Sequence, residues 1–141
     1  MSFSDEIAIR TIWGEARGEP PQGKLAVAHV LLNRLNDGRW GSTAAMVCLW
    51  PSQFSCWAVN DPNRMKICRL DDADQTLLLC QQAWQQANLS NAPDPTQGAK
   101  FYYADSMATP PLWATRMTET AHIGSQHYLI GNGAGSVPTG W

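Results

Sequence analysis

Charged side chains are scarce in this chain of 141 residues, and neither sign predominates. They make up 16% of the sequence, and ten Lys and Arg against twelve Asp and Glu leave a formal net charge of −2. Binding to nucleic acid or to an acidic membrane surface through charge needs a basic excess. We therefore expect no nucleic-acid partner. A hydrophobic content of 44% also separates the chain from disordered proteins, which combine few apolar groups with high net charge.

Long hydrophobic runs are absent as well. The longest apolar stretch, residues 25–32, is interrupted by His29 and is too short to span a bilayer. The first ten residues do not have the basic segment and apolar segment of a secretory signal peptide. We therefore expect no membrane insertion, no signal peptide, and synthesis in the cytoplasm. The length suits a single domain that buries its own core.

The four cysteines do not form the closely spaced pairs that bind metals. They stand at positions 48, 56, 68 and 80, and no His lies at zinc-finger spacing from them. We therefore expect no metal and no cofactor. An even count permits two disulfides in three possible pairings, but cytoplasmic synthesis favours free thiols. A bridge between Cys48 and Cys56 is the alternative if the protein later enters an oxidising compartment.

Hydrophobic periodicity and turn residues predict a mainly helical α+β domain over residues 1–130, followed by a loose Gly-rich tail over residues 131–141. Ser4 is the expected N-cap of the first helix. We expect helices over 4–18, 22–36 and 71–88, a long loop over 38–70 with a short helix near 43–49, and strands over 99–104 and 122–129.

Glu15 is the residue whose position most clearly suggests chemistry. At 100° per residue it falls within about 20° of Ala8, on the apolar side of the first predicted helix. Glu19 projects in a similar direction, whereas Arg10 and Arg17 point toward solvent. Burial raises the pKa of a carboxyl group, and a raised pKa suits a general acid. A carboxylate satisfied by backbone or Arg contacts near a helix end is the alternative interpretation.

The segments around Glu15 and downstream of it resemble the SleB-type cell-wall hydrolase family, whose founding members are spore cortex-lytic enzymes. The resemblance begins with Gly-Glu-Ala-Arg-Gly-Glu at 14–19 and runs in family order over roughly residues 5–129. The further blocks are Gly23, Val27-Ala28, Leu32-Asn33-Arg34, Pro51-Ser52-Gln53-Phe54-Ser55, Asp94-Pro95-Thr96, Gly98-Ala99, Phe101-Tyr102-Tyr103, Ile123-Gly124 and His127-Tyr128. Ser125 and Gln126 place His127 one position later than the family's usual spacing, so no role is carried over for it.

This resemblance implies a lysozyme-like fold and cleavage of the peptidoglycan glycan strand between N-acetylmuramic acid and N-acetylglucosamine, characteristically as a lytic transglycosylase. It also implies that Glu15 is the catalytic acid. We expect six further residues to contact substrate: Glu19, Gln53, Phe54, Ser55, Tyr102 and Tyr103. Phe54 is equally compatible with anchoring its loop to the core. Tyr102 and Tyr103 alternate along a predicted strand, so one faces inward and the other outward.

Three other functions stay open. A muramidase needs a second carboxylate beside Glu15, and Glu19 is the nearest. A zinc amidase or endopeptidase needs a ligand set such as two His with a carboxylate, and no motif such as His-Glu-x-x-His is present. A non-enzymatic wall-binding phage module would not require Glu15. The missing second carboxylate favours the transglycosylase, because that reaction uses no attacking water.

The loop with Gln53 to Trp57 and Asp61 to Arg64 resembles the versions carried by phages of Gram-negative hosts. We therefore expect a monomeric phage endolysin that serves host-cell lysis. It would be made in the host cytoplasm and would act on periplasmic peptidoglycan after a separate holin opens the membrane.

Overall fold

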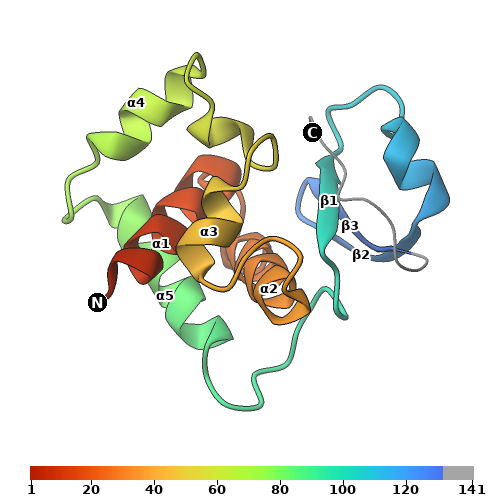
Figure 1. Ribbon diagram of the computed structural model, residues 1–141, viewed down its shortest axis with the longest axis horizontal. Coiled ribbons are helices and arrows are strands. Elements are labelled where there is room, and N and C mark those ends of the chain that lie inside the picture. The colour runs from red at the N-terminus through yellow and green to blue at the C-terminus, as the bar shows by residue number, and fades with distance from the viewer. Residues whose placement is uncertain (132–141) are drawn as a thin grey trace.

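A computed structural model describes residues 1–131 as a group of α-helices with a three-stranded antiparallel sheet on one side (Figure 1). The helices are α1 (Phe3–Ala16), α2 (Pro21–Asp37), α3 (Ala44–Leu49), α4 (Pro62–Cys68) and α5 (Gln75–Ala87), with short 3-10 helices η1 (Ser55–Trp57) and η2 (Leu112–Arg116). The strands are β1 (Phe101–Ala104), β2 (Thr118–Ile123) and β3 (Gln126–Ile130). Apart from its first residue, the predicted tail lies outside the described residues.

The first helix begins two residues earlier than the expected cap implies. Ser2, not Ser4, is the N-cap: its hydroxyl accepts from the backbone N–H of Asp5, and the Asp5 carboxylate accepts in return from Ser2. This reciprocal pair is a capping box, which satisfies donors that the first turn leaves unpaired. The hydroxyl of Ser4 accepts instead from the backbone of Ala45, which ties α3 to α1.

Helix α2 packs against α1, α3 and α5. It starts at Pro21, whose missing N–H costs nothing in a first turn, and ends at Gly38, which adopts a left-handed φ of 89°. Its middle is buried around the helix, from Leu25 to Leu31. Helix α5 packs beside it, and its predicted inward face is confirmed: Leu77, Cys80, Ala83, Trp84 and Ala87 are all buried.

Helix α4 lies within the segment that we expected to be a loop. Asp61 caps it through the backbone N–H of Asn63, and Pro62 begins it. Arg10 was expected in solvent, but its guanidinium donates to the backbone oxygen of Ile67 at 2.8 Å. The backbone oxygens at the end of α4 thus accept hydrogen bonds from the Arg10 guanidinium, and these bonds hold α4 against α1.

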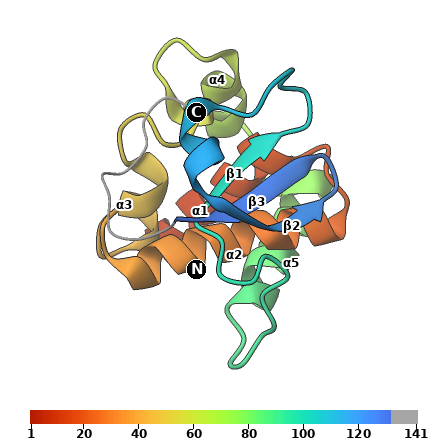
Figure 2. The same cartoon turned by 90° about the vertical axis from the view of Figure 1, so that its right-hand side faces the viewer.

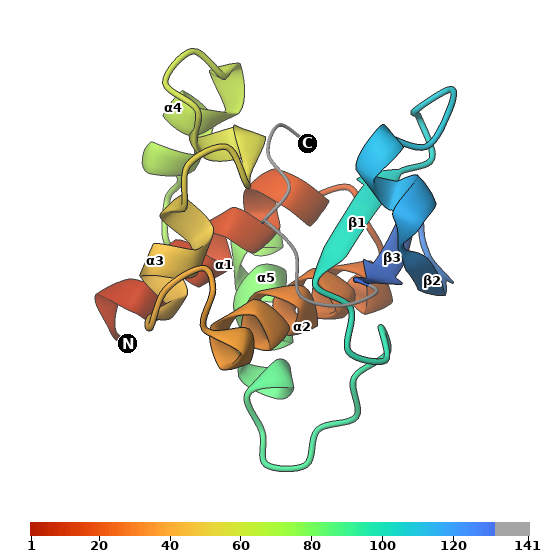
Figure 3. The ribbon, with the colours of Figure 1, turned by 45° about the vertical axis from the view of Figure 1, so that its right-hand side comes forward.

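The predicted strand over 122–129 is two strands joined by a tight turn at Gly124 and Ser125. The sheet order is β1–β3–β2, with both pairings antiparallel (Figure 2). The C-terminal end of α1 lies beside β1, as the intermediate view shows (Figure 3). Among the described residues no helix combines the length and the apolar character needed to cross a bilayer.

Candidate active site

Glu15 sits in the last turn of α1, where that helix meets η1 and α4. The approach is close because residue 14 is a glycine. A Cβ on Gly14 would lie 2.8 Å from the Cβ of Cys56 and 2.7 Å from the Cδ1 of Ile67, closer than real Cβ contacts. The first glycine of the 14–19 motif therefore allows Cys56 to approach the neighbouring carboxylate.

Two side chains donate hydrogen bonds to the Glu15 carboxylate. The hydroxyl of Tyr102, on β1, lies 2.5 Å from Oε1, and the thiol of Cys56 is the second donor. The buried guanidinium of Arg34 adds an attractive charge. Burial opposes all three and outweighs them, so the pKa of Glu15 is raised above its ordinary value. A carboxyl group that keeps its proton in this way is suited to act as a general acid.

The Glu15 side chain opens into a cavity of about 230 Å³ between the end of α1, η1 and the sheet. The lining residues are Glu15, Ser55, Tyr102, Tyr103, Ala104, Met107, Pro111, Trp113 and Gln126. Glu15 is the only carboxylate among them. A second cavity of about 410 Å³ lies on the other side of Ser55, which lines both, and its walls include Trp50, Phe54 and Trp57. Aromatic side chains beside polar groups suit a sugar, because a sugar presents flat apolar faces and hydroxyl groups at its edges.

Three of the residues expected to contact substrate reach the Glu15 cavity. Ser55 is exposed and lines both cavities. Tyr102 is the inward tyrosine, with its hydroxyl on Glu15, and its own pKa is raised well above the usual range by burial and by that carboxylate. Tyr103 is half-buried on the other face of β1 and also lines the cavity.

Gln53 lies inside the protein rather than in the Glu15 cavity, and Phe54 takes the core-anchoring position that was left open for it. Gln53 is 1% exposed, and its amide oxygen accepts from Arg34 at 3.2 Å inside the protein. Phe54 is 3% exposed, with its ring centroid 5.0 Å from the guanidinium carbon of Arg34, while its edge lines the second cavity. The loop therefore uses Gln53 and Phe54 to hold the buried cation, and burial lowers the pKa of Arg34 to about 9.

Glu19 points to the β2–β3 turn. Its carboxylate accepts from the backbone N–H of Ser125 at 2.8 Å and from the hydroxyl of Ser125 at 2.7 Å. Gly124 has a φ of 58°, and a Cβ there would lie 2.5 Å from Oε1 of Glu19, so only glycine fits this contact. Glu19 is not among the residues that line the Glu15 cavity. Its evident role is to fasten the turn to the end of α1.

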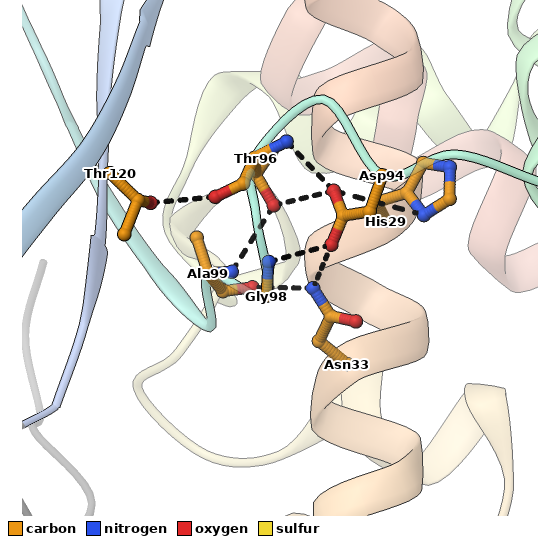
Figure 4. Close-up of polar contacts among 7 residues, drawn as sticks. All are labelled: His29, Asn33, Asp94, Thr96, Gly98, Ala99 and Thr120. Carbon is orange, nitrogen blue, oxygen red and sulfur yellow. Dashed lines mark hydrogen bonds and ion pairs between the residues drawn. The ribbon is translucent and has the colours of Figure 1, made fainter.

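The Asp94-Pro95-Thr96 block anchors the connection that leads into β1. The Asp94 carboxylate accepts from Asn33 on α2, from the backbone and hydroxyl of Thr96, and from the backbone of Gly98, all between 2.7 and 2.9 Å (Figure 4). Thr120 on β2 donates to the backbone oxygen of Thr96. Nδ1 of His29 lies 3.9 Å from Asp94. The motif therefore fixes the start of β1 to α2 and to the sheet.

Several residues at the site escaped the sequence reasoning. The thiol of Cys56 was considered only as a disulfide partner, although it follows Ser55 directly. Gln126 donates to the backbone oxygen of Glu15 at 3.4 Å and accepts from the hydroxyl of Tyr128. Trp113 comes from η2 and lines the cavity, and no motif marked it. Only the fold brings these residues within reach of Glu15.

Comparison with known families gives a consistent result. A family model described as cell wall hydrolase matches residues 18–129, most of the chain. The chain belongs to the cell wall hydrolase family. The matched span begins just after Glu15. Similarity to the solved structures of this family, which covers 92% of the chain, extends further.

The relatives of this cell wall hydrolase include spore cortex-lytic enzymes from Oceanobacillus iheyensis and Bacillus subtilis. Each is 32% identical over 108 residues, covering 74% and 76% of this chain respectively. The chain spans about a third of the length of these curated relatives, 33% and 32%.

Two solved structures share the fold. The catalytic domain of the Bacillus cereus SleB protein has a TM-score of 0.72 and 27% identity, and the match covers 91% of that domain. The catalytic domain of the germination-specific lytic transglycosylase SleB from Bacillus anthracis gives 0.72 and 26%, with 97% covered. The expected lysozyme-like α+β fold is thereby confirmed.

Proposed function

We propose that this cell wall hydrolase cleaves the glycan strand of bacterial peptidoglycan between N-acetylmuramic acid and N-acetylglucosamine as a lytic transglycosylase. The observation that carries the proposal is the carboxylate of Glu15, which has a raised pKa and is the single carboxylate in the lining of a cavity that also contains Tyr102, Tyr103 and Trp113. The similarity to a solved catalytic domain named as a lytic transglycosylase supports it.

In the proposed reaction Glu15 acts first as an acid. Its proton passes to the glycosidic oxygen, and the bond from that oxygen to C1 of the muramic acid breaks. The glucosamine end leaves as an alcohol, and positive charge develops at C1. Tyr102 and Cys56 donate to the carboxylate and stabilise the negative charge that Glu15 acquires at this point.

Glu15 then acts as a base. It removes the proton of the 6-hydroxyl of the same muramic acid, whose oxygen attacks C1 and closes a 1,6-anhydro ring. The carboxyl group regains its proton, and no water is consumed. One carboxylate therefore completes the cycle. We assign Ser55 and Tyr103 to substrate positioning, since both line the cavity beside Glu15.

The alternative is a muramidase that uses Glu19 as the second carboxylate. The two hydrogen bonds from Ser125 and the absence of Glu19 from the cavity lining argue against it. Glu15→Gln and Glu19→Gln separate the two mechanisms when both are assayed on purified sacculi. We expect Glu15→Gln to lose activity by about 10²–10⁴-fold. Glu19→Gln is expected to keep most of it. Equal loss in two folded variants would favour the two-carboxylate reaction.

We further propose that the protein serves as a monomeric phage endolysin. In this setting it is made in the host cytoplasm and reaches the periplasmic peptidoglycan through a holin. The resemblance of the Gln53–Trp57 loop to phage versions supports this role. Expression in a Gram-negative host with and without a holin tests it: lysis is expected only with the holin. A protein that binds sacculi and releases no soluble fragments would instead be a wall-binding module.

A further inference from the structure

Three aromatic rings form a row across one face of the sheet, and the first of them, Tyr103, also lines the Glu15 cavity. Tyr103 pairs with His127 between β1 and β3, and His127 pairs with His122 between β3 and β2. The rings of Tyr103 and His127 stack at 4.8 Å between centroids, and those of His127 and His122 stack at 4.0 Å. The two imidazoles are nearly parallel, at 12°.

A β-bulge in β2 brings a carboxylate to the same face. Glu119 and His122 are three residues apart, so in a regular strand they would face opposite sides. The register shifts between Glu119 and Ala121, and this shift places both residues on the face that carries His127. Glu119 Oε1 then lies 2.8 Å from Nδ1 of His127.

Asp105, the residue after β1, completes the cluster. Its backbone N–H donates to the carbonyl of Ser125 in the β2–β3 turn at 2.7 Å, which fixes its position. Its carboxylate lies 3.0 Å from Nε2 of His122 and contacts Nε2 of His127 directly. One ligand atom from each of Asp105, His122 and His127 lies within 4.8 Å of the others.

Both ring nitrogens of His127 contact a carboxylate, Nδ1 that of Glu119 and Nε2 that of Asp105. A neutral imidazole cannot satisfy both. A neutral imidazole has one N–H, so it can donate to Glu119 or to Asp105 but not to both. When Nδ1 donates to Glu119, the lone pair of Nε2 faces the Asp105 carboxylate. These two groups repel each other. A cation between Nε2 and the carboxylate, either a second proton or a metal ion, removes the repulsion. A carboxylate behind the second nitrogen of a histidine is also the usual support of a metal ligand.

We propose that Asp105, His122 and His127 bind one divalent transition-metal ion of the zinc class, with Glu119 orienting His127. Zinc bonds of about 2.0–2.2 Å place tetrahedral ligand atoms roughly 3.3 Å apart, close to the spacing of the Asp105 and His122 atoms. The remaining coordination position faces solvent, because Asp105 and His122 are exposed. The ion links the end of β1 to the β2–β3 hairpin behind Tyr103, and so stiffens one wall of the cavity.

This site differs from the catalytic zinc that was considered for an amidase. Asp105 follows β1, whereas His122 and His127 lie on the two strands of one hairpin, and together they do not form a motif such as His-Glu-x-x-His. The expectation of no metal rested on the lack of such motifs. The proposed ion braces the wall of the cavity and takes no part in the reaction assigned to Glu15.

Calorimetric titration with zinc chloride at about pH 8, where an ordinary imidazole is mostly neutral, tests the proposal. The exposed thiol of Cys68 is first removed by Cys68→Ser, so that it cannot bind the ion. We expect one zinc per chain and a Tm that rises with zinc concentration. Titration with cobalt(II) in place of zinc should also produce a d–d absorption band, which reports binding of the metal by the protein ligands.

In the same background, Asp105→Asn, His122→Gln and His127→Gln should each weaken zinc binding by at least about tenfold, and Glu119→Gln by about tenfold. Asp72→Asn is the control, since it removes an exposed carboxylate that lies outside the cluster and pairs with Arg10. Melting curves without zinc establish that each variant is folded. Failure of the folded parent to bind zinc stoichiometrically would overturn the proposal. So would binding that survives in the His122→Gln and Asp105→Asn variants.

Discussion

At the scale of single residues, the site depends on the carboxyl group of Glu15, and the fold loses stability when that group ionises away from water. Glu15 is half-buried at the end of a helix, and its pKa is raised because desolvation outweighs its hydrogen bonds. Its inward position follows from 100° per residue, and the resemblance to the cell-wall hydrolase family, not periodicity alone, implies its role as the acid. Its partners were not predictable, because Tyr102 lies 87 residues away and joins Glu15 only when β1 packs beside α1.

The first prediction is that Glu15→Gln produces a protein that is inactive yet more stable. A pKa that is higher in the folded than in the unfolded state makes stability fall as pH rises between the two values. The glutamine removes that loss. We expect a higher Tm than wild type above the folded pKa and no difference below about pH 4. Each kcal/mol gained should raise Tm by roughly 4 °C in a chain of this size.

Thermal unfolding of both proteins across this pH range measures the effect. Glu6→Gln is the control on the same helix, because Glu6 is exposed and pairs only loosely with Arg10 at 3.9 Å. Its effect should stay within about 0.5 kcal/mol. A lower Tm for Glu15→Gln at neutral pH would mean that the charged carboxylate stabilises the fold, which contradicts the account.

The second prediction concerns the pH profile of Tyr102→Phe. The tyrosine hydroxyl stabilises the ionised form of Glu15, so its removal should raise the pKa of Glu15 further. A general acid loses activity as pH rises through its pKa. The alkaline limb of kcat/KM should therefore move to higher pH, with a lower maximum. Tyr103→Phe, one residue along the strand, should leave the position of that limb unchanged. A shift to lower pH in Tyr102→Phe would refute this role of the hydroxyl.

At the scale of elements, the long helices were predictable and the short elements were not. Helices α2 and α5 repeat apolar residues over several turns, so their faces could be read directly. Helix α4 has seven residues and buries only Ile67, too little for a periodic signal. The hairpin resembles one strand in the sequence because its turn, Gly124 and Ser125, is only two residues long. That turn is held by Glu19, which lies more than a hundred residues earlier.

The third prediction concerns the anchor at Asp94. Burial alone would raise the pKa of this carboxyl, but hydrogen bonds from Asn33, Thr96 and Gly98 outweigh it and lower the pKa. Stability from this group is therefore present at neutral pH and disappears as pH falls through the folded pKa. Asp94→Asn should cost about 2–3 kcal/mol at neutral pH, or roughly 10 °C in Tm, and much less in acid.

Parallel melting curves at neutral and acid pH check the Asp94 prediction. Asp71→Asn provides the comparison, since Asp71 caps an exposed turn through one bond to the backbone of Ala73. If Asp94→Asn lowers Tm by the same amount in acid as at neutral pH, then the shape of the side chain, and not its charge, stabilises this connection. That result would contradict the prediction.

At the scale of the whole molecule, one core is built without disulfides. All four cysteines are free, and Cys48, Cys56 and Cys80 are buried. Burial raises the pKa of Cys48 and of Cys80 to about 12, and it raises that of Cys56 as well. A buried thiol with a raised pKa behaves as a small hydrophobic group and reacts slowly.

The fourth prediction follows from this distribution of thiols. One cysteine, Cys68, should react rapidly with an alkylating reagent in the folded protein, and all four should react after unfolding. Reductant should leave activity largely unchanged and lower Tm by a few degrees at most. Peptide mapping identifies the labelled site. A loss of most activity on reduction, recovered on reoxidation, would show that the protein as isolated depends on a bridge such as Cys48–Cys56.

The central claim is that a single carboxylate cleaves the glycan without water. Digestion of purified sacculi in water enriched in heavy oxygen, followed by mass spectrometry of the fragments, tests it most directly. We predict anhydromuramoyl ends, lighter than reducing ends by one water and free of the heavy isotope. Reducing muramoyl ends that carry the isotope would show that water attacks C1, and would contradict the account.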